Sequence, residues 1–190
     1  MYQITPSPFL IHSTKYLVPS IDFSSHGSYL LRHIEPAMPT LLEAIRGVAN
    51  ACEPLTGLVT GGQPGASQLE AMKAAGVSVI LDLREPMEPR PIDEPAKVAQ
   101  LGMEYVNVPV SGGRLNDTTL ESILKVLRDK GAKQVYMHCG SGNRVGGALI
   151  AHLMLDQGMD EEDAVATAMK VGLRSAEYLE WGLDYVRRHS

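Results

Sequence analysis

The sequence predicts an α/β fold in which a parallel sheet of about four to five strands carries helices on both faces. Three observations predict it. From residue 55 onward, short apolar runs alternate with amphipathic segments, and strands that alternate with helices build parallel sheets covered on both sides. The strand candidates are rich in β-branched residues, and a glycine-bearing loop follows the last of them. Ligands of such sheets bind beyond the carboxyl ends of the strands, so this loop is the first candidate site.

Four segments are predicted strands, because each is a short apolar run bounded by turn residues. The clearest is VSVILDL, whose Val and Ile residues favour a buried strand. The last of the four ends directly before Cys139. The predicted strands cover residues 58–60, 77–83, 104–110 and 134–138.

Two Ser/Thr-x-x-Glu patterns predict helix starts, because the two side chains of such a capping box bond each other's backbone N–H groups. Ser67 with Glu70 forms one pattern, and Thr118 with Glu121 forms the other. Residues 143–155 are apolar almost all round, which predicts a buried helix. Further helices are expected at residues 94–101, 160–170 and 175–188, the last with Tyr178, Trp181 and Tyr185 on a core-facing stripe.

Residues 1–54 do not follow this alternation and are predicted to form a partly helical N-terminal extension. The helical part is expected at residues 39–51. We expect the extension to pack on the core or on another subunit, which makes it a route to a homo-oligomer. Residues 55–190 are predicted to form one α/β domain.

The composition narrows the classes of partner. The chain has 190 residues, of which 44% are hydrophobic and 21% charged, a balance typical of a soluble globular protein. A net charge of -5 argues against nucleic acid, because binding to a phosphate backbone needs a basic face. The N-terminus lacks the pattern of a secretory signal, and no apolar stretch is long enough to span a bilayer. We therefore expect no membrane partner and a cytoplasmic location, where both cysteines stay reduced.

The segment that carries chemistry joins the last predicted strand to the apolar helix and reads His138-Cys139-Gly140-Ser141-Gly142-Asn143-Arg144. A glycine-bearing loop at a helix start points several backbone N–H groups into one concavity, and the helix dipole adds positive charge there. Such a place favours the thiolate form of Cys139. The planar guanidinium of Arg144 can bind two oxygens of one phosphate. Together these groups suit attack on phosphorus. The alternative is that Cys139 is a small core residue and the glycines only turn the chain.

The loop resembles the signature of the protein tyrosine phosphatase superfamily, His-Cys-x5-Arg, although only four residues separate Cys139 from Arg144. The shorter Cys-x-x-Gly-x-Arg loop is similar to a bacterial group of atypical dual-specificity-phosphatase-like proteins, the beta-lactamase-hydrolase-like family, also labelled sulfurtransferases. Three other segments agree with that family, and the resemblance covers about residues 58–155. They are Thr60-Gly61-Gly62-Gln63-Pro64, Leu81-Asp82-Leu83-Arg84 and Tyr105-Val106-Asn107-Val108-Pro109-Val110.

The resemblance implies a cysteine-phosphatase-like domain at residues 55–190 with Cys139 as nucleophile and Arg144 as oxyanion clamp. His138 would orient the loop and favour the thiolate; the equal alternative is a buried histidine at a strand end. No cofactor is implied, and no metal is expected, since the histidines show no ligand spacing. The expected partner is a phosphorylated small molecule or a phosphoprotein. The implied phosphate-binding residues are Gly140, Ser141, Gly142, Asn143 and Arg144.

The sequence departs from the phosphatase pattern at two positions. Val145 stands where phosphatases carry a Ser or Thr whose hydroxyl helps the thiolate leave; Ser141 could replace it or only bond its own backbone. The loop after the third strand has no carboxylate until Asp117, which is interpreted as a helix N-cap rather than a general acid. Arg84 could line the site or pair with Glu85 or Glu88.

The sequence leaves three hypotheses for function. The first is a phosphatase that hydrolyses aryl phosphate monoesters, including phosphotyrosine, through a phosphocysteine intermediate, with weak activity that favours good leaving groups. The second is a rhodanese-type sulfurtransferase in which Cys139 carries a persulfide. The third is a phosphate-binding module without catalysis.

Overall fold

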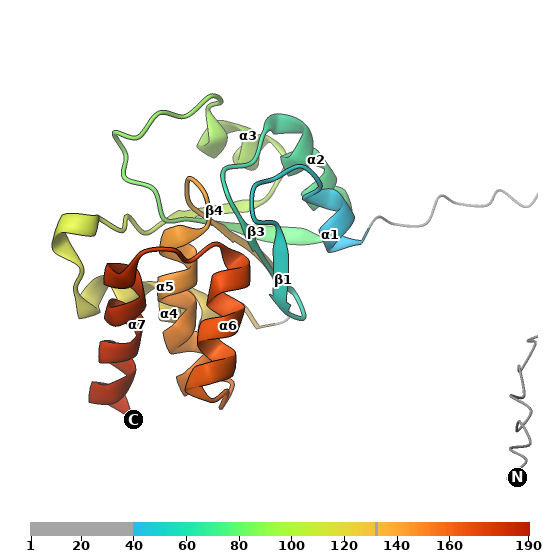
Figure 1. The fold of residues 1–190 in the computed structure, drawn as a ribbon. Coiled ribbons are helices and arrows are strands. Elements are labelled where there is room, and N and C mark those ends of the chain that lie inside the picture. Colours follow the sequence, from blue (N-terminus) through green and yellow to red (C-terminus); the bar gives the residue numbers. More distant parts are fainter. Residues whose placement is uncertain (1–39, 132) are drawn as a thin grey trace, which may run out of the picture. The chain divides into compact units, whose positions relative to one another are not determined.

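The computed structural model describes residues 40–131 and 133–190 (Figure 1). The described helices and strands are, in chain order, α1 (Leu41–Ala44), β1 (Cys52–Leu55), β2 (Leu58–Gly61), α2 (Ala66–Ala74), β3 (Val77–Asp82), α3 (Glu94–Gln100), β4 (Glu104–Asn107), the 3-10 turn η1 (Gly112–Arg114), α4 (Asp117–Asp129), β5 (Gln134–His138), α5 (Asn143–Leu155), α6 (Glu161–Val171) and α7 (Ala176–His189).

The described strands form one five-stranded sheet in the order β1-β2-β5-β3-β4. β2, β5, β3 and β4 run parallel, and β1 pairs antiparallel with β2 at the edge. The predicted α/β fold with a sheet of four to five strands is therefore confirmed. The register sets Gly61 of β2 and Asp82 of β3 beside His138 of the central strand β5. These three carboxyl ends place the loop after β5 in the middle of one edge of the sheet.

Helices cover both faces of the sheet, as predicted (Figure 1). Ile80 and Tyr136 point to the face that packs on α1, α2 and α3, and Leu81 and Met137 point to the face that packs on α4 to α7. This alternation follows from the two-residue period of a strand. All four of these side chains are buried, so the central strands are apolar on both sides.

Helix α5 lies close against α7 because both helices carry glycine at the crossing. A Cβ atom on Gly147 would lie 2.7 Å from the carbonyl oxygen of Tyr178, and one on Gly182 would lie 2.4 Å from the carbonyl oxygen of Gly147. Larger side chains there would push the two helices apart. The predicted buried helix at residues 143–155 has the same bounds as α5. Its close packing fixes the N-terminus of α5 at the carboxyl edge of the sheet.

Both predicted capping boxes are wrong in detail. Helix α2 begins after Gly65, whose N–H donates to Gln68 Oε1 at 2.9 Å. Helix α4 begins after Asn116, whose Oδ1 accepts from Thr119 N–H at 2.9 Å. Asp117, which the sequence analysis takes as the N-cap, is the first residue within α4. Asn and Asp cap about equally well, so their order in the sequence does not decide which one caps.

The predicted boundary between residues 54 and 55 falls within β1. From Thr40 onward the predicted extension contributes to the α/β unit, because Ile45 and Val48 are buried in the cluster that contains Val59 and Tyr136. The predicted helix at residues 39–51 is shorter in the structure, since α1 ends at Ala44 and turns follow. The rest of the predicted extension lies outside the described residues.

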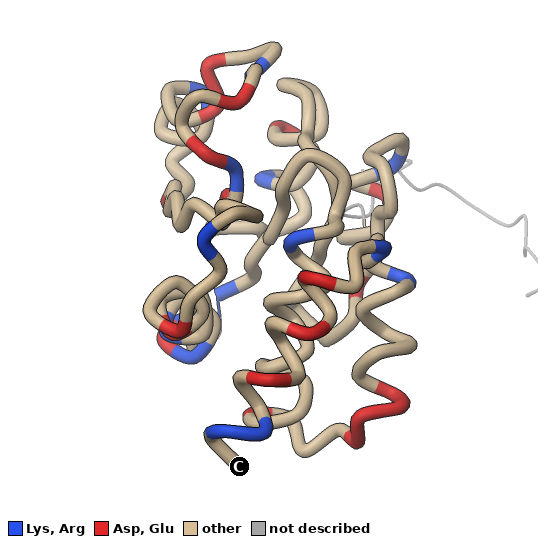
Figure 2. The backbone as a smooth tube through the Cα atoms, turned by 60° about the vertical axis from the view of Figure 1, so that its left-hand side comes forward, with Lys and Arg blue, Asp and Glu red and all other residues tan. Residues whose placement is uncertain are grey.

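Among the described helices, none is long and apolar enough to cross a membrane. Lys and Arg are interspersed with Asp and Glu along the described chain (Figure 2), in line with the mixed composition of the sequence.

Candidate active site

The loop from Cys139 to Arg144 joins β5 to α5. Cys139 is buried, with 1% of its surface exposed, and its Sγ accepts a hydrogen bond from the Gly142 N–H at 3.2 Å. Gly142 has φ of 90°, and a Cβ atom there would lie 2.1 Å from the carbonyl oxygen of Val171. Only glycine fits this position, both for its backbone angle and for its space. The glycine at position 142 therefore allows a backbone N–H to donate directly to the Cys139 sulfur.

Neighbouring segments hold the carbonyl groups of this loop. The Gln63 N–H donates to the carbonyl oxygen of Gly140 at 3.2 Å, and Asn50 Nδ2 donates to that of Ser141 at 2.7 Å. Carbonyl and N–H groups of a trans peptide point in opposite directions. Anchoring the carbonyls in this way directs the following N–H groups to the other side, toward the concavity of the loop.

Asn143 is the first residue of α5, and its side chain is turned to the connection between α6 and α7. Its Oδ1 accepts from the N–H groups of Arg174 at 2.8 Å and Ser175 at 3.1 Å. Asn143 can therefore offer its backbone N–H, but not this oxygen, to a ligand in the loop. Its side chain ties the loop to the start of α7.

Arg144 is held by an acidic residue from a different part of the chain. Glu88, in the Pro-rich connection between β3 and α3, accepts from Arg144 Nη1 with one oxygen and from Nη2 at 2.7 Å with the other. Nη1 also lies 3.4 Å from the carbonyl oxygen of Leu83 and 3.3 Å from that of Val110. These contacts fix the plane of the guanidinium group.

Arg144 has N–H donors that the contacts with Glu88, Leu83 and Val110 do not use. A guanidinium carries five N–H donors. Glu88 and the two carbonyl groups occupy both donors of Nη1 and one of Nη2. No oxygen atom of a described residue accepts from the Nε–H or from the second N–H of Nη2, and the remaining side-chain contact of Arg144 is with Cys139, which also helps to raise the pKa of the arginine. These two N–H groups lie on one edge of the planar group, which is the geometry that binds two oxygens of a phosphate.

The ion pair also sets the charges of both partners. Hydrogen bonding to Arg144 lowers the pKa of Glu88, so this carboxylate is ionised at neutral pH. Hydrogen bonding to Glu88 raises the pKa of Arg144 above its usual value, against the effect of burial. An ionised Glu88 is in the wrong state to donate a proton, so we interpret it as a residue that orients Arg144.

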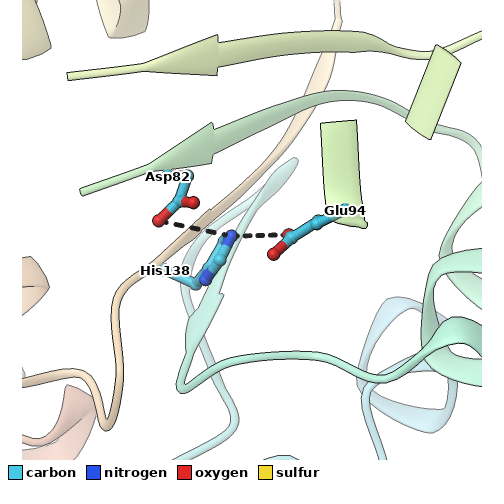
Figure 3. Close-up of side chains that lie close together, drawn as sticks. All are labelled: Asp82, Glu94 and His138. Carbon is cyan, nitrogen blue, oxygen red and sulfur yellow. Dashed lines mark ion pairs between the residues drawn. The ribbon is translucent and has the colours of Figure 1, made fainter. Parts of the chain in front are cut away.

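His138 lies at the end of β5 in a buried cluster of charged side chains (Figure 3). Its Nε2 lies 2.8 Å from Glu94 Oε1 and 3.9 Å from Asp82 Oδ1. Its Nδ1 lies 3.3 Å from the carbonyl oxygen of Cys139. The predicted catalytic residues Cys139 and Arg144 thus lie at the two ends of the loop, whereas His138 is the last residue of β5 and lies behind the loop rather than in its concavity.

Arg84 bonds neither Glu85 nor Glu88, and that prediction is wrong. Its Nε and Nη2 donate to Asp82 at 2.9 and 2.7 Å, and Nη2 also contacts Glu94. Burial opposes the ionisation of Asp82, but the hydrogen bonds from Arg84 outweigh it and lower the pKa of Asp82 to about 2. Arg84 lies in a bend just beyond the end of β3, where its backbone N–H also donates to Asp82 Oδ1 at 2.9 Å. This local turn explains the pairing, because it brings the Arg84 side chain back to the Asp82 carboxylate.

The connection after β4 forms another wall of the site. It runs from Val108 to Asn116, includes the turn η1 and carries no carboxylate. Asp117 pairs with Arg188 of α7 through both carboxylate oxygens. Hydrogen bonding to Arg188 lowers the pKa of Asp117, so this carboxylate is ionised and is bonded outside the site.

Tyr178, assigned to the core by its spacing, is half-buried. Its hydroxyl lies against the turn η1, where it would be 3.1 Å from a Cβ atom on Gly112.

Glu88 and Glu94, which contact Arg144 and His138, were not predicted as site residues from the sequence. Both belong to the connection and helix between β3 and β4. A signal was present, since several carboxylates gather in a Pro-rich segment right after a strand end. Which of them reaches Arg144 or His138 depends on the path of that segment.

Comparisons with known proteins find a family model and solved structures that are similar to this chain. The model of a family described as "DSP-PTPase phosphatase fused to NAD+ Kinase" matches residues 46–179. A comparison with curated proteins finds no match.

Solved structures share the fold at low identity. A DUF442 protein from Shewanella putrefaciens CN-32 aligns with a TM-score of 0.68 and 22% identity over 78% of this chain and 99% of its own. A cysteine-to-serine variant of P. aeruginosa TpbA in complex with pTyr aligns with a TM-score of 0.57 and 20% identity over 75% of this chain and 90% of its own. The core catalytic domain of the PP-IP phosphatase SIW14 from S. cerevisiae aligns with a TM-score of 0.62 and 15% identity over 75% of this chain and 91% of its own.

Proposed function

Because the chain belongs to the family of DSP-PTPase phosphatases described as fused to NAD+ kinase, we propose that it hydrolyses phosphate monoesters through a phosphocysteine intermediate on Cys139. The observation that supports this best is the Nε–Nη2 edge of the Arg144 guanidinium, which no oxygen of a described residue occupies. It belongs to the same loop as the Cys139 sulfur, which contacts Arg144 and accepts a hydrogen bond from the Gly142 N–H. A phosphoryl group between them would meet a nucleophile and a two-donor clamp at once.

In the first step the Cys139 thiolate attacks phosphorus. An S–P bond forms, the P–O bond to the leaving group breaks, and the leaving oxygen departs with the electron pair. Arg144 and the backbone N–H groups of the loop bind the equatorial oxygens, where negative charge is spread in the transition state. The leaving oxygen takes its proton from water, because no described carboxylate of the site is available to supply it.

In the second step a water molecule attacks the phosphocysteine. The new P–O bond forms, the S–P bond breaks, and inorganic phosphate leaves while sulfur recovers its electron pair. The Gly142 N–H, 3.2 Å from Sγ, stabilises the charge that returns to sulfur. In phosphatases with Ser or Thr after the arginine, the hydroxyl of that residue stabilises the leaving sulfur. Val145 has no hydroxyl, so the Gly142 N–H takes this role here.

We propose aryl phosphates, including phosphotyrosine, as the substrate class, carried by a small molecule or a phosphoprotein. Phenolic oxygens leave without a proton more readily than alkyl oxygens, which suits a site without a free acid. The pTyr complex of TpbA, a protein of the same fold, supports this choice. The rhodanese-type and non-catalytic hypotheses gain no support from the family match.

A paired assay tests the function. Purified protein is given para-nitrophenyl phosphate in one arm and thiosulfate with cyanide in the other. We expect turnover in the first arm only, and a phosphorylated Cys139 peptide in acid-quenched samples analysed by mass spectrometry. Cys139→Ser should abolish turnover, while Cys52→Ser, which changes the half-buried thiol on β1, is the matched control. Thiocyanate formation without phosphate release would overturn the proposal.

A further inference from the structure

Tyr178 on α7 carries a hydroxyl group that reaches the wall of the candidate site. Its ring is half-buried and packs against the core, but the hydroxyl makes no hydrogen bond with a residue that the structure describes. The backbone of Tyr178 is fixed against α5, because a Cβ atom on Gly147 would lie 2.7 Å from the Tyr178 carbonyl oxygen and 2.8 Å from its Cβ. Gly147 stands about one helical turn beyond Arg144. The side chain therefore starts beside the catalytic loop.

The hydroxyl occupies space that a side chain at position 112 would need. Gly112 begins η1, in the connection after β4 that forms a wall of the site. A Cβ atom on Gly112 would lie 3.1 Å from Tyr178 Oη, a tight contact for a methyl group. The same connection meets the loop through Val110, whose carbonyl oxygen lies 3.3 Å from Arg144 Nη1. Tyr178 Oη therefore lies at the part of the wall that adjoins the arginine.

The charged groups of the site act on this hydroxyl. Burial raises the pKa of Tyr178 above its usual value, and Arg144 opposes the rise. Glu177, Cys139 and Glu88 add to the rise. The phenol is therefore neutral at pH 7 and carries its proton. The Glu88 carboxylate is already bonded to Arg144, so it does not take the hydroxyl as a donor. The O–H is thus available to a ligand.

We propose that Tyr178 is a catalytic residue whose hydroxyl donates a hydrogen bond to the leaving oxygen of the substrate. The proposal rests on the proposed phosphatase function, which places the phosphoryl group between Cys139 and Arg144. Attacking and leaving atoms lie roughly in line in such a reaction. Cys139 is buried at the floor of the loop, so the leaving oxygen departs on the open side, which the wall with Gly112 borders.

The hydrogen bond acts while the P–O bond breaks and its electron pair moves to the leaving oxygen. A donor in place stabilises this developing charge. Tyr178 keeps its proton, because its raised pKa makes it a weaker acid than the phenol that leaves. The departing phenolate then takes its proton from water. The contribution of Tyr178 is therefore largest for leaving groups whose charge stays concentrated on oxygen.

Two aryl phosphates with different leaving groups measure this contribution. Para-nitrophenolate spreads its charge into the nitro group, whereas phenolate holds more of it on oxygen. We expect Tyr178→Phe to lower kcat/KM by about threefold for para-nitrophenyl phosphate and by about tenfold for phenyl phosphate. A residue that only supports the fold would lower both values equally. Tyr185→Phe, which removes a hydroxyl from a buried ring on the same helix, is the control.

The turn η1 offers a second pair of variants. The methyl group of Gly112→Ala enters the space of the Tyr178 hydroxyl, whereas a Cβ atom on the next residue, Gly113, has no atom within 4 Å. We expect Gly112→Ala to reproduce the unequal loss of Tyr178→Phe, and Gly113→Ala to resemble wild type. In a Tyr178→Phe background Gly112→Ala should cause no further loss, because the hydroxyl that it displaces is absent.

Binding tests the contact without turnover. Cys139→Ser protein forms no phosphocysteine, so calorimetry can compare phenyl phosphate with benzylphosphonate, in which a CH2 group replaces the ester oxygen. We expect Tyr178→Phe in this background to weaken phenyl phosphate by about threefold and to leave benzylphosphonate unchanged, since only the ester oxygen accepts a hydrogen bond.

Equal losses for the two aryl phosphates, or no loss, would overturn the proposal. If wild type hydrolyses neither of them, the phosphatase function fails, and the binding comparison alone decides whether Tyr178 contacts the ester oxygen. Equal binding of phenyl phosphate with and without the hydroxyl would then overturn that contact as well. If Tyr178→Phe does not fold, the comparison of Gly112→Ala with Gly113→Ala decides.

Discussion

The carboxylate of Glu88 faces the Arg144 guanidinium end-on and bonds both of its terminal nitrogens. This leaves the edge formed by Nε and Nη2 without an oxygen acceptor among the described residues and next to the Cys139 side chain. The acidic residue therefore does not compete with a phosphate for the same donors but holds the arginine in the plane in which it can bind one.

Glu88→Gln should lower kcat/KM for para-nitrophenyl phosphate by about tenfold, which corresponds to roughly 1.4 kcal/mol of transition-state stabilisation. A neutral amide offers one acceptor oxygen and cannot hold both terminal nitrogens of Arg144. Glu85→Gln on the same connection is the control, because only the backbone of Glu85 contacts Glu88, at 2.7 Å. An increase in activity would show instead that Glu88 blocks the site.

Cys139→Ser should lose turnover but keep an anion-binding loop, because the backbone donors and Arg144 do not depend on sulfur. Phosphate binding by isothermal titration calorimetry should remain within about tenfold of wild type, or roughly 1.4 kcal/mol. Retention of most of the hydrolytic activity would show that another residue is the nucleophile.

Arg144→Lys should lose more than about tenfold in kcat/KM although the charge is kept. A lysine ammonium is a point donor and can neither span two phosphate oxygens nor meet both oxygens of Glu88. Steady-state kinetics with an aryl phosphate measure the loss. A smaller effect would mean that Arg144 does not clamp the transition state.

Asp117→Asn should leave the hydrolysis of aryl phosphates near normal, because this carboxylate is ionised and bonded to Arg188. Alkyl phosphates should be poor substrates for wild type and variant alike, since a positioned acid typically contributes about 10²–10⁴-fold. The assay compares para-nitrophenyl phosphate with an alkyl phosphate, with thermal unfolding as the check on folding. A large loss of rate at unchanged stability would identify Asp117 as the acid.

Acid should destabilise the protein through Asp82. The pKa of Asp82 is about 2 in the folded protein against 3.8 for an ordinary aspartate. A lowered folded pKa means that the stabilisation is complete above about pH 4 and is lost as pH falls through about 2, on the order of 2 kcal/mol. Thermal unfolding from pH 5 to 2 measures it.

Asp82→Asn supplies the variant for that measurement. It should be destabilised by about 3 kcal/mol at pH 7, because it leaves part of the Arg84 charge buried without its partner. Its unfolding should also depend less on pH between 4 and 2. Asp129→Asn, which removes an exposed pair with Lys125, is the control and should resemble wild type. Equal acid sensitivity of wild type and Asp82→Asn would contradict the assignment.

The sequence by itself determined the features that neighbouring residues encode. The alternation of strands and helices predicted the sheet, and α5 has the predicted bounds. The order of residues from Cys139 to Arg144 predicted a loop whose donors face a thiol, because a strand end, two glycines and a helix start define that shape locally. The phosphatase family to which the chain belongs agrees with the phosphatase resemblance of this loop.

Only the tertiary structure decided which distant residues complete the site. Glu88 is 56 positions from Arg144, and the segment that carries it also holds Glu85 and Glu94. Nothing in their local sequence distinguishes a carboxylate that orients an arginine from one that faces water. The distinction arises because the register of β3 against β5 sets Asp82 beside His138. Beyond β3 the chain brings Glu88 to Arg144 and Glu94 to His138, and this arrangement is set by long-range packing.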